Sequence, residues 1–158
     1  EENNLYHIDI IDLNEYNFPV FNERLRFQNN PAEKVVEFTG RIKSADGIIM
    51  VTPEYNGGYP ASLKNVIDLL YDEWHRKPIA IATVSNGQFG GSQVITSLLF
   101  SLWKMRAWVI PAMFPVPYVQ NAFDIEGNPA DVEAVSKRTE NFINELFWCI
   151  EAKSRMSI

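Results

Sequence analysis

Residues 52–70, TPEYNGGYPASLKNVIDLL, place an acid, an aromatic ring and an amide next to one another as Glu54, Tyr55 and Asn56. The apolar run before these residues predicts a buried strand, and the apolar spacing after them predicts a helix. The surrounding prolines and glycines also suit an ordinary tight turn, whatever the protein does. Loops at the ends of strands often carry binding residues, so this loop is a candidate ligand contact that offers a flat, apolar surface.

A second loop, residues 85–91 (SNGQFGG), also lies between a predicted strand and a predicted helix. Glycine lets backbone N–H groups approach a ligand closely, and the positive end of the following helix favours an electron-rich edge of that ligand. The spacing matches neither the dinucleotide fingerprint GxGxxG nor a Walker loop. Taken alone, the loop suits a structural turn before a helix equally well.

The elements that must position these loops alternate along the chain. Helical apolar stripes predict helices that follow strands, which implies βαβ crossovers and a parallel sheet with helices on both faces. Pro111 and Pro115 indicate that the last strand lies toward an edge of the sheet or is short. The predicted strands are residues 5–13, 46–53, 77–85 and 108–116, and the predicted helices are residues 29–45, 63–74, 94–105 and 129–150.

The two loops are expected to meet at one edge of this sheet. In open parallel sheets, ligands bind beyond the carboxyl ends of the strands, where the strand order reverses. The strand at residues 46–53 lacks polar alternation and is therefore expected to be covered on both faces.

The string PEYN, followed by a small residue, Pro and LKNVID, resembles the signature of the NAD(P)H-dependent FMN reductases, which include quinone, azo and chromate reductases. The resemblance implies an α/β, flavodoxin-like three-layer sandwich with a doubly wound parallel sheet, and it implies bound FMN. By the same resemblance, the first loop lines the isoalloxazine ring and the second holds its O2 and N1 side. The implied flavin contacts are Pro53, Glu54, Tyr55, Asn56, Ser85, Asn86, Gly87 and Gly90.

One part of the family pattern has no counterpart in this sequence. The family binds the ribityl phosphate with a GSxRxxS-like loop after its first strand, and the 158 residues contain no such string. The chain is thus expected to form a single flavodoxin-like FMN-binding domain, residues 1–158, without the N-terminal βα unit. In the order 2-1-3-4-5 that unit's strand lies between the strands at residues 5–13 and 46–53, so we expect residues upstream of Glu1 to supply it.

The resemblance implies an oxidoreductase that transfers hydride from NADH or NADPH via FMN to a quinone, an azo compound, a metal oxyanion or free flavin. No covalent nucleophile or other catalytic residue is required, because the flavin carries the reaction. The alternative is a flavin-binding or interaction module of the same fold that does not turn over NAD(P)H. Phe89, Phe114 and Tyr118 are candidate walls of the substrate channel, and the apolar segment SLLFSLWKM is a candidate homodimer face, with a homotetramer as the larger assembly.

Composition argues against other classes. A net charge of -6 without any run of Lys and Arg disfavours nucleic acid as a partner. No apolar stretch is long enough for a membrane span, and the single cysteine, Cys149, cannot form an internal disulfide. His7 and His75 have no Cys or carboxylate at ligand spacing, so no metal site is predicted. These features predict a cytoplasmic protein.

Overall fold

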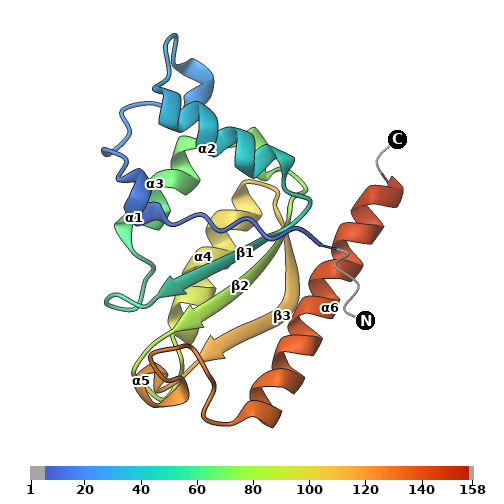
Figure 1. Cartoon of the computed structure of the whole chain (residues 1–158). Helices are drawn as coiled ribbons and strands as arrows, with labels where there is room; N and C mark the ends of the chain where they lie inside the picture. Colours follow the sequence, from blue (N-terminus) through green and yellow to red (C-terminus); the bar gives the residue numbers. More distant parts are fainter. Residues whose placement is uncertain (1–5, 157–158) are drawn as a thin grey trace.

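The computed structural model describes residues 6–156, and these contain one sheet of three parallel strands. The strands are β1 (Ile48–Pro53), β2 (Pro78–Val84) and β3 (Trp108–Val116), in the order β1-β2-β3 (Figure 1). Each is one of the predicted strands. Apolar runs of this length without polar alternation suit parallel strands, and β2 is buried along nearly its whole length.

Helices connect the strands as the apolar stripes predicted. Of the described helices, α6 is the longest, and none is both long and apolar enough to cross a membrane. The predicted helix at residues 63–74 ends earlier than expected, at Leu69, and a separate 3-10 turn then carries Trp74 back into the core. The helices are α1 (Leu13–Tyr16), α2 (Glu33–Ser44), α3 (Ala61–Leu69), α4 (Ser92–Lys104), α5 (Val119–Ala122) and α6 (Val132–Met156), with 3-10 turns η1 (Leu25–Phe27) and η2 (Asp72–Trp74).

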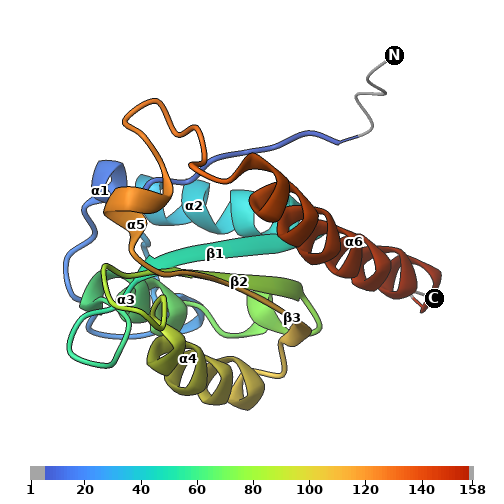
Figure 2. The same cartoon turned by 90° about the horizontal axis from the view of Figure 1, so that it is seen from below.

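Two hydrophobic clusters lie on opposite faces of the sheet. Figure 2 shows α4 and α6 on these opposite sides. Along β2, Ile79 and Ile81 face the cluster formed with α2, α3 and α4, whereas Ala80 and Ala82 face α6. Small residues on the α6 face let that long helix approach the sheet closely. The predicted arrangement of a parallel sheet between two helical layers is therefore confirmed.

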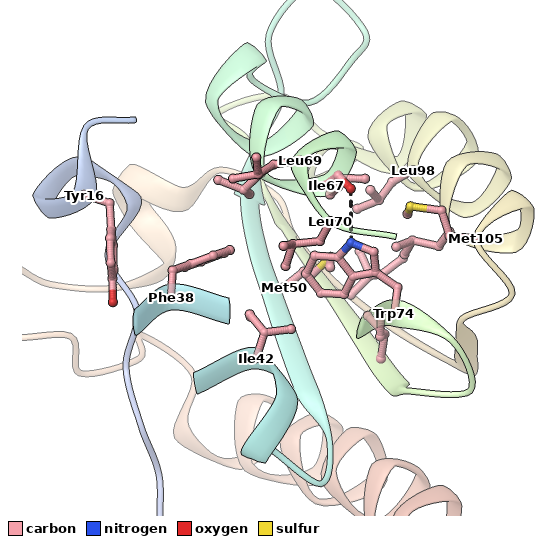
Figure 3. Close-up of a cluster of buried hydrophobic side chains, with 14 of the residues drawn as sticks. Tyr16, Phe38, Ile42, Met50, Ile67, Leu69, Leu70, Trp74, Leu98 and Met105 are labelled. Carbon is pink, nitrogen blue, oxygen red and sulfur yellow. Dashed lines mark hydrogen bonds between the residues drawn. The ribbon is translucent and has the colours of Figure 1, made fainter. Parts of the chain in front are cut away.

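The larger of the two clusters is the one that Ile79 and Ile81 face, and Trp74 lies within it (Figure 3). Its side chain is 2% exposed, and its indole Nε1 donates a hydrogen bond of 3.1 Å to the carbonyl of Ile67. A buried indole N–H without an acceptor would cost stability, so this bond fixes the ring against α3.

The prolines of β3 take an edge position, as expected. Among residues 6–156, β3 pairs only with β2. The register shifts between Ile79 and Ile81, which pair with Val109 and Met113. The irregularity accommodates Pro111, which has no N–H to donate to a ladder.

The strand predicted at residues 5–13 is wrong for the part that the structure describes. Residues 6–11 form no ladder, and Ile8 and Ile10 are 80% and 82% exposed. Side-chain contacts hold this segment instead. The guanidinium of Arg41 in α2 lies 2.5 Å from a carboxylate oxygen of Asp9. The Tyr6 ring stacks on the Phe147 ring of α6, with 4.0 Å between the ring centroids. Alternating residues form a strand only beside a partner, and no described strand lies next to this segment.

The prediction that β1 is covered on both faces is also wrong. Met50 and Thr52 are buried against the larger cluster, but Ile49 and Val51 on the other face are 42% and 67% exposed. α6 packs mainly against β2 and β3 on that face and leaves Ile49 and Val51 open to solvent. Because an apolar run indicates only that a strand can be buried, it does not reveal which neighbouring elements are there to bury it.

Candidate functional site

The loops singled out from the sequence leave the sheet at the same edge. In the parallel ladders the last residue of β1, Pro53, is the Cα partner of Val84, the last residue of β2. Val84 in turn pairs with Val116 at the end of β3. The residues that follow these positions therefore emerge side by side, at the end of the sheet where α5 lies in Figure 1.

The first loop is a tight hairpin turn. Tyr55 and Gly58 exchange two backbone hydrogen bonds, of 2.8 and 3.0 Å, around Asn56 and Gly57. The φ angles of these two central residues are 53° and 76°, as a type I′ turn requires, and Asn-Gly is a favoured pair for that turn. The turn directs the Tyr55 ring outward, where it is 65% exposed.

The second loop is fastened to the sheet at both ends. The Ser85 N–H donates to the carbonyl of Val116 at 3.1 Å, and the buried Thr83 hydroxyl donates to the carbonyl of Gly90 at 2.6 Å. Within the loop, the Gly87 N–H donates to Ser85 Oγ at 2.9 Å. Ser85 thus has a structural role in shaping the turn, beyond any contact with a ligand.

Gly90 packs directly against the chain that leaves β3. Its φ is +58°, and a β-carbon there would lie 2.8 Å from the nitrogen of Pro117 and 2.9 Å from Val116 backbone atoms. No larger residue fits without moving the backbone. The segment after β3 is bound to the same loop, because Tyr118 and Val119 donate to the carbonyls of Gly87 and Ser85 at 3.4 and 3.2 Å.

The two loops also meet each other through α4. A β-carbon at Gly57 would lie 2.8 Å from Gln93 Oε1, so the first turn of α4 touches the tip of the first loop. Gln93 was not among the residues predicted for the site. A polar residue two positions after a glycine pair has no distinctive pattern, so the sequence offered no signal for it.

Backbone donors remain available in the second loop. Within residues 6–156, the N–H groups of Asn86, Gln88 and Phe89 have no intramolecular acceptor. Such groups can bind a ligand that presents carbonyl or ring-nitrogen acceptors. Asn86 and Gly87 are exposed, so their backbone is open to a ligand from solvent.

The three aromatic residues considered for the channel divide between two places. Phe89 and Tyr118 are 68% and 51% exposed at the loop edge of the sheet. Phe114 instead packs on α6, with its ring centroid 5.4 Å from that of Phe142 and the Arg138 guanidinium 4.7 Å above it. Phe114 therefore belongs to the core beneath α6, because side chains along β3 alternate between the two faces.

Glu54 is half-buried, and among the described residues it forms no ion pair. The guanidinium groups of Arg24 and Arg26 lie over the Tyr71 ring, 4.8 and 5.1 Å from its centroid, and do not pair with Glu54.

Comparison with known proteins gives consistent matches. The family model of the NADPH-dependent FMN reductases matches residues 1–121. An NAD(P)H-dependent FMN reductase of Saccharomyces cerevisiae is 34% identical over 155 residues, which cover 91% of this chain and 77% of that protein. A second one, from Schizosaccharomyces pombe, is 47% identical over 73 residues, covering 46% of this chain and 36% of that protein. The chain thus spans about a third of one curated relative and about three quarters of the other.

The fold has close counterparts among solved structures. The flavoenzyme NAD(P)H:(acceptor) oxidoreductase of Paracoccus denitrificans superimposes with a TM-score of 0.70 at 23% identity, covering 88% of this chain and 79% of that one. This likeness confirms the flavodoxin-like α/β fold that the family resemblance implies. Together with the match over residues 1–121, it leads to one assignment: the chain belongs to the family of NADPH-dependent FMN reductases.

Proposed function

We propose that this chain is an FMN-dependent NAD(P)H oxidoreductase whose flavin ring is held between the loops at residues 53–58 and 85–91. The observation that carries the proposal is the adjacency of the two loops, which leave β1 and β2 at paired positions and touch through Gln93. The family's own description, which pairs NADPH with FMN, supports both cofactors.

The residues present fit a flavin ring. The free N–H groups of Asn86, Gln88 and Phe89 match the acceptors along the pyrimidine edge of an isoalloxazine. Gly87, with no side chain, allows close approach to that edge. Pro53, Tyr55 and Phe89 offer exposed apolar or aromatic surface for the ring faces. Glu54 and Asn56 complete the first loop, whereas Ser85 and Gly90 hold the second loop in shape.

When bound, FMN supplies the hydride-accepting and hydride-donating chemistry. The chain's own task is to position the ring and to leave one face open to the nicotinamide and then to the electron acceptor. The exposed Tyr55, Phe89 and Tyr118 lie at the sheet edge where both must approach. Proximity and stacking suffice for hydride transfer, so no protein acid or nucleophile is assigned.

Steady-state turnover tests the proposal directly. In a mixture of purified protein, FMN, a quinone and NADH or NADPH, the rate of nicotinamide oxidation should rise in proportion to the protein concentration. An azo dye, a metal oxyanion or free flavin can then replace the quinone as the electron acceptor. Protein that stays colourless and takes up no added FMN would remove the proposal. Protein that binds flavin without oxidising NAD(P)H would instead be the alternative, a flavin-binding module of the same fold.

The exposed face of α4 supports a homodimer, or a tetramer built from two such dimers. Phe100 and Trp103 are 64% and 67% exposed, and a shallow hollow of about 580 Å³ lies between α4 and the start of β3. Contiguous exposed apolar surface of this kind commonly marks an interface. The hollow is lined by Thr96, Leu99, Phe100, Trp103, Ala107, Trp108 and Val109.

We further place the protein in the cytoplasm. Cys149 is buried and free, and the described core relies on apolar packing in the absence of disulfides. Such cysteine usage is typical of a reducing compartment.

A further inference from the structure

A second hollow lies at the opposite end of the sheet from the flavin loops. It has a volume of about 490 Å³, within the range of small-ligand sites. Lys77 directly precedes β2, so this is the end from which the arrows of Figure 1 start. The lining residues are Leu25, Arg26, Lys43, Asp72, Glu73, His75, Lys77 and Lys153.

The hollow concentrates positive charge in an acidic protein. The whole chain has a net charge of -6, yet four of its 14 Lys and Arg residues line this one site. They come from four separate segments, namely η1, the end of α2, the start of β2 and the end of α6. The fold therefore brings these four basic side chains together from distant parts of the sequence. A run of lysines on one exposed helix would need no such folding.

Lys77 is the most buried of these cations, with 5% of the residue exposed. Its ammonium donates to the carbonyls of Lys43, at 3.1 Å, and Ala45. Burial, together with the nearby Lys153, lowers the pKa of Lys77 below its ordinary value. An ammonium has three donors, so two carbonyl acceptors leave one N–H for a ligand.

The acidic groups of the hollow do not cancel this charge. Glu73 is already engaged, because it accepts the Tyr71 N–H at 3.1 Å and lies 3.4 Å from the Lys43 ammonium. Asp72 is exposed, and among residues 6–156 it forms no ion pair. The four basic side chains of the lining outnumber its two carboxylates, and Asp46 is a further acidic group near Lys77, so a ligand that enters the hollow still meets more positive than negative charge.

Arg26 has the donors that an oxyanion requires. Its guanidinium lies over the rings of Phe27 and Tyr71, at 4.7 and 5.1 Å, which engage its flat face and leave its in-plane N–H groups available. Within the described part of the chain, Arg26 has no carboxylate within ion-pair distance. A planar fork of donors beside ammonium groups is the combination that recognises phosphate.

We propose that this hollow binds a phosphate-bearing anion of the diphosphate type, with Arg26 and Lys77 as its principal donors. The site shares no residue with the flavin loops and lies beyond the opposite end of β2, so it does not rest on the proposed reductase activity. A diphosphate matches the spread of cations from several segments better than a single monovalent anion does.

Isothermal titration of the purified chain with inorganic pyrophosphate tests the proposal. We expect saturable 1:1 binding that weakens as NaCl is added. Arg26→Gln and Lys77→Met should each weaken binding by about tenfold, the usual effect of losing one charge-assisted hydrogen bond. Lys137→Gln, which removes an exposed charge from the N-terminal half of α6, is the matched control and should leave the affinity unchanged.

A parallel titration with ADP separates the two sources of a diphosphate. Equal affinities assign the site to the free anion, and tighter binding of ADP assigns it to a nucleotide. Arg26 is exposed, so its variant should fold even if loss of the buried Lys77 ammonium does not allow folding. The proposal fails if pyrophosphate and ADP both show no saturable binding, or if Lys137→Gln weakens binding as much as Arg26→Gln does.

Discussion

A β-carbon at Gly57 would lie 2.8 Å from Oε1 of Gln93, so the tip of the first loop and the first turn of α4 are in direct contact. This contact joins the first flavin loop to the helix that directly follows the second loop. The position of one loop thus depends on the other, and changes in either should alter the same binding site.

Gly57→Ala should weaken both the fold and flavin binding. Its φ of +76° is unfavourable for alanine by about 1 kcal/mol. The nearby Gln93 oxygen ends a flexible side chain, so its displacement adds little to the free energy but moves a residue of the site. Urea denaturation should show a stability loss of about 1 kcal/mol. Flavin titration should show weaker binding by the same variant.

Gly40→Ala is a suitable control for that variant. Gly40 lies within α2, and a β-carbon there would have no atom within 4 Å. Alanine should stabilise this helix by about 0.5 to 1 kcal/mol without affecting flavin binding. A loss of stability in both variants would show that the conformation of the turn is not the cause.

Gly90→Ala should be far more damaging, because its β-carbon would meet backbone atoms that cannot rotate away. The nearest are the nitrogen of Pro117 at 2.8 Å and Val116 atoms at 2.9 Å. We expect a loss of about 3 kcal/mol or more in the free energy of unfolding. Gly127→Ala isolates the effect of φ, since Gly127 has a φ of +87° and open space around it. Similar losses in the two variants would contradict the close approach of the second loop to β3.

The affinity for a flavin should depend mainly on contacts with its isoalloxazine ring. The two loops are suited to the isoalloxazine ring, which FMN shares with riboflavin, so these 158 residues should bind FMN and riboflavin, which lacks the phosphate, with similar Kd values. Tyr55→Ala should weaken both by about tenfold through loss of aromatic contact. Tyr6→Ala, which removes another exposed tyrosine from the stack on Phe147, should have no effect on either. A strong preference for FMN would show that phosphate contacts from elsewhere dominate.

The sequence could predict most of the elements but not everything that surrounds them. The apolar run of β2 and the stripe Val35, Phe38 and Ile42 of α2 are found where periodicity placed them, because these residues are buried by elements that the chain itself contains. The exposed Val51 and the unpaired Ile10 show the opposite case. Their patterns are those of strand residues, but pairing and covering depend on a third element that no local pattern encodes.

The same limit applies to the candidate site. Turn chemistry identified the Asn56–Gly57 pair and, in the second loop, Gly90 and Gly91, because their positive φ values favour such residues. Gln93 and the packing of Phe114 under α6 depend on how separate elements come together in space. A single sequence carries no direct signal for such contacts.

Glu73→Gln should reduce the sensitivity of the fold to acid. Although burial alone raises the pKa of the Glu73 carboxyl, the Tyr71 N–H and Lys43 together hold it below its ordinary value of 4.5. A lowered pKa means that the carboxylate stabilises the fold above pH 4.5 and that this contribution is lost as the pH falls through the lowered pKa. The variant should therefore be less stable than the wild type at neutral pH, by about 1 kcal/mol.

Chemical denaturation at a series of pH values checks this expectation. Between neutral pH and strong acid, the difference in free energy of unfolding between wild type and Glu73→Gln should narrow, with most of the change below pH 4.5. Glu151→Gln, in an exposed pair with Arg155 on α6, is the control and should shift stability by less than about 0.5 kcal/mol. A constant difference across the whole series would mean that Glu73 acts through its shape and hydrogen bonding, and that its charge contributes nothing.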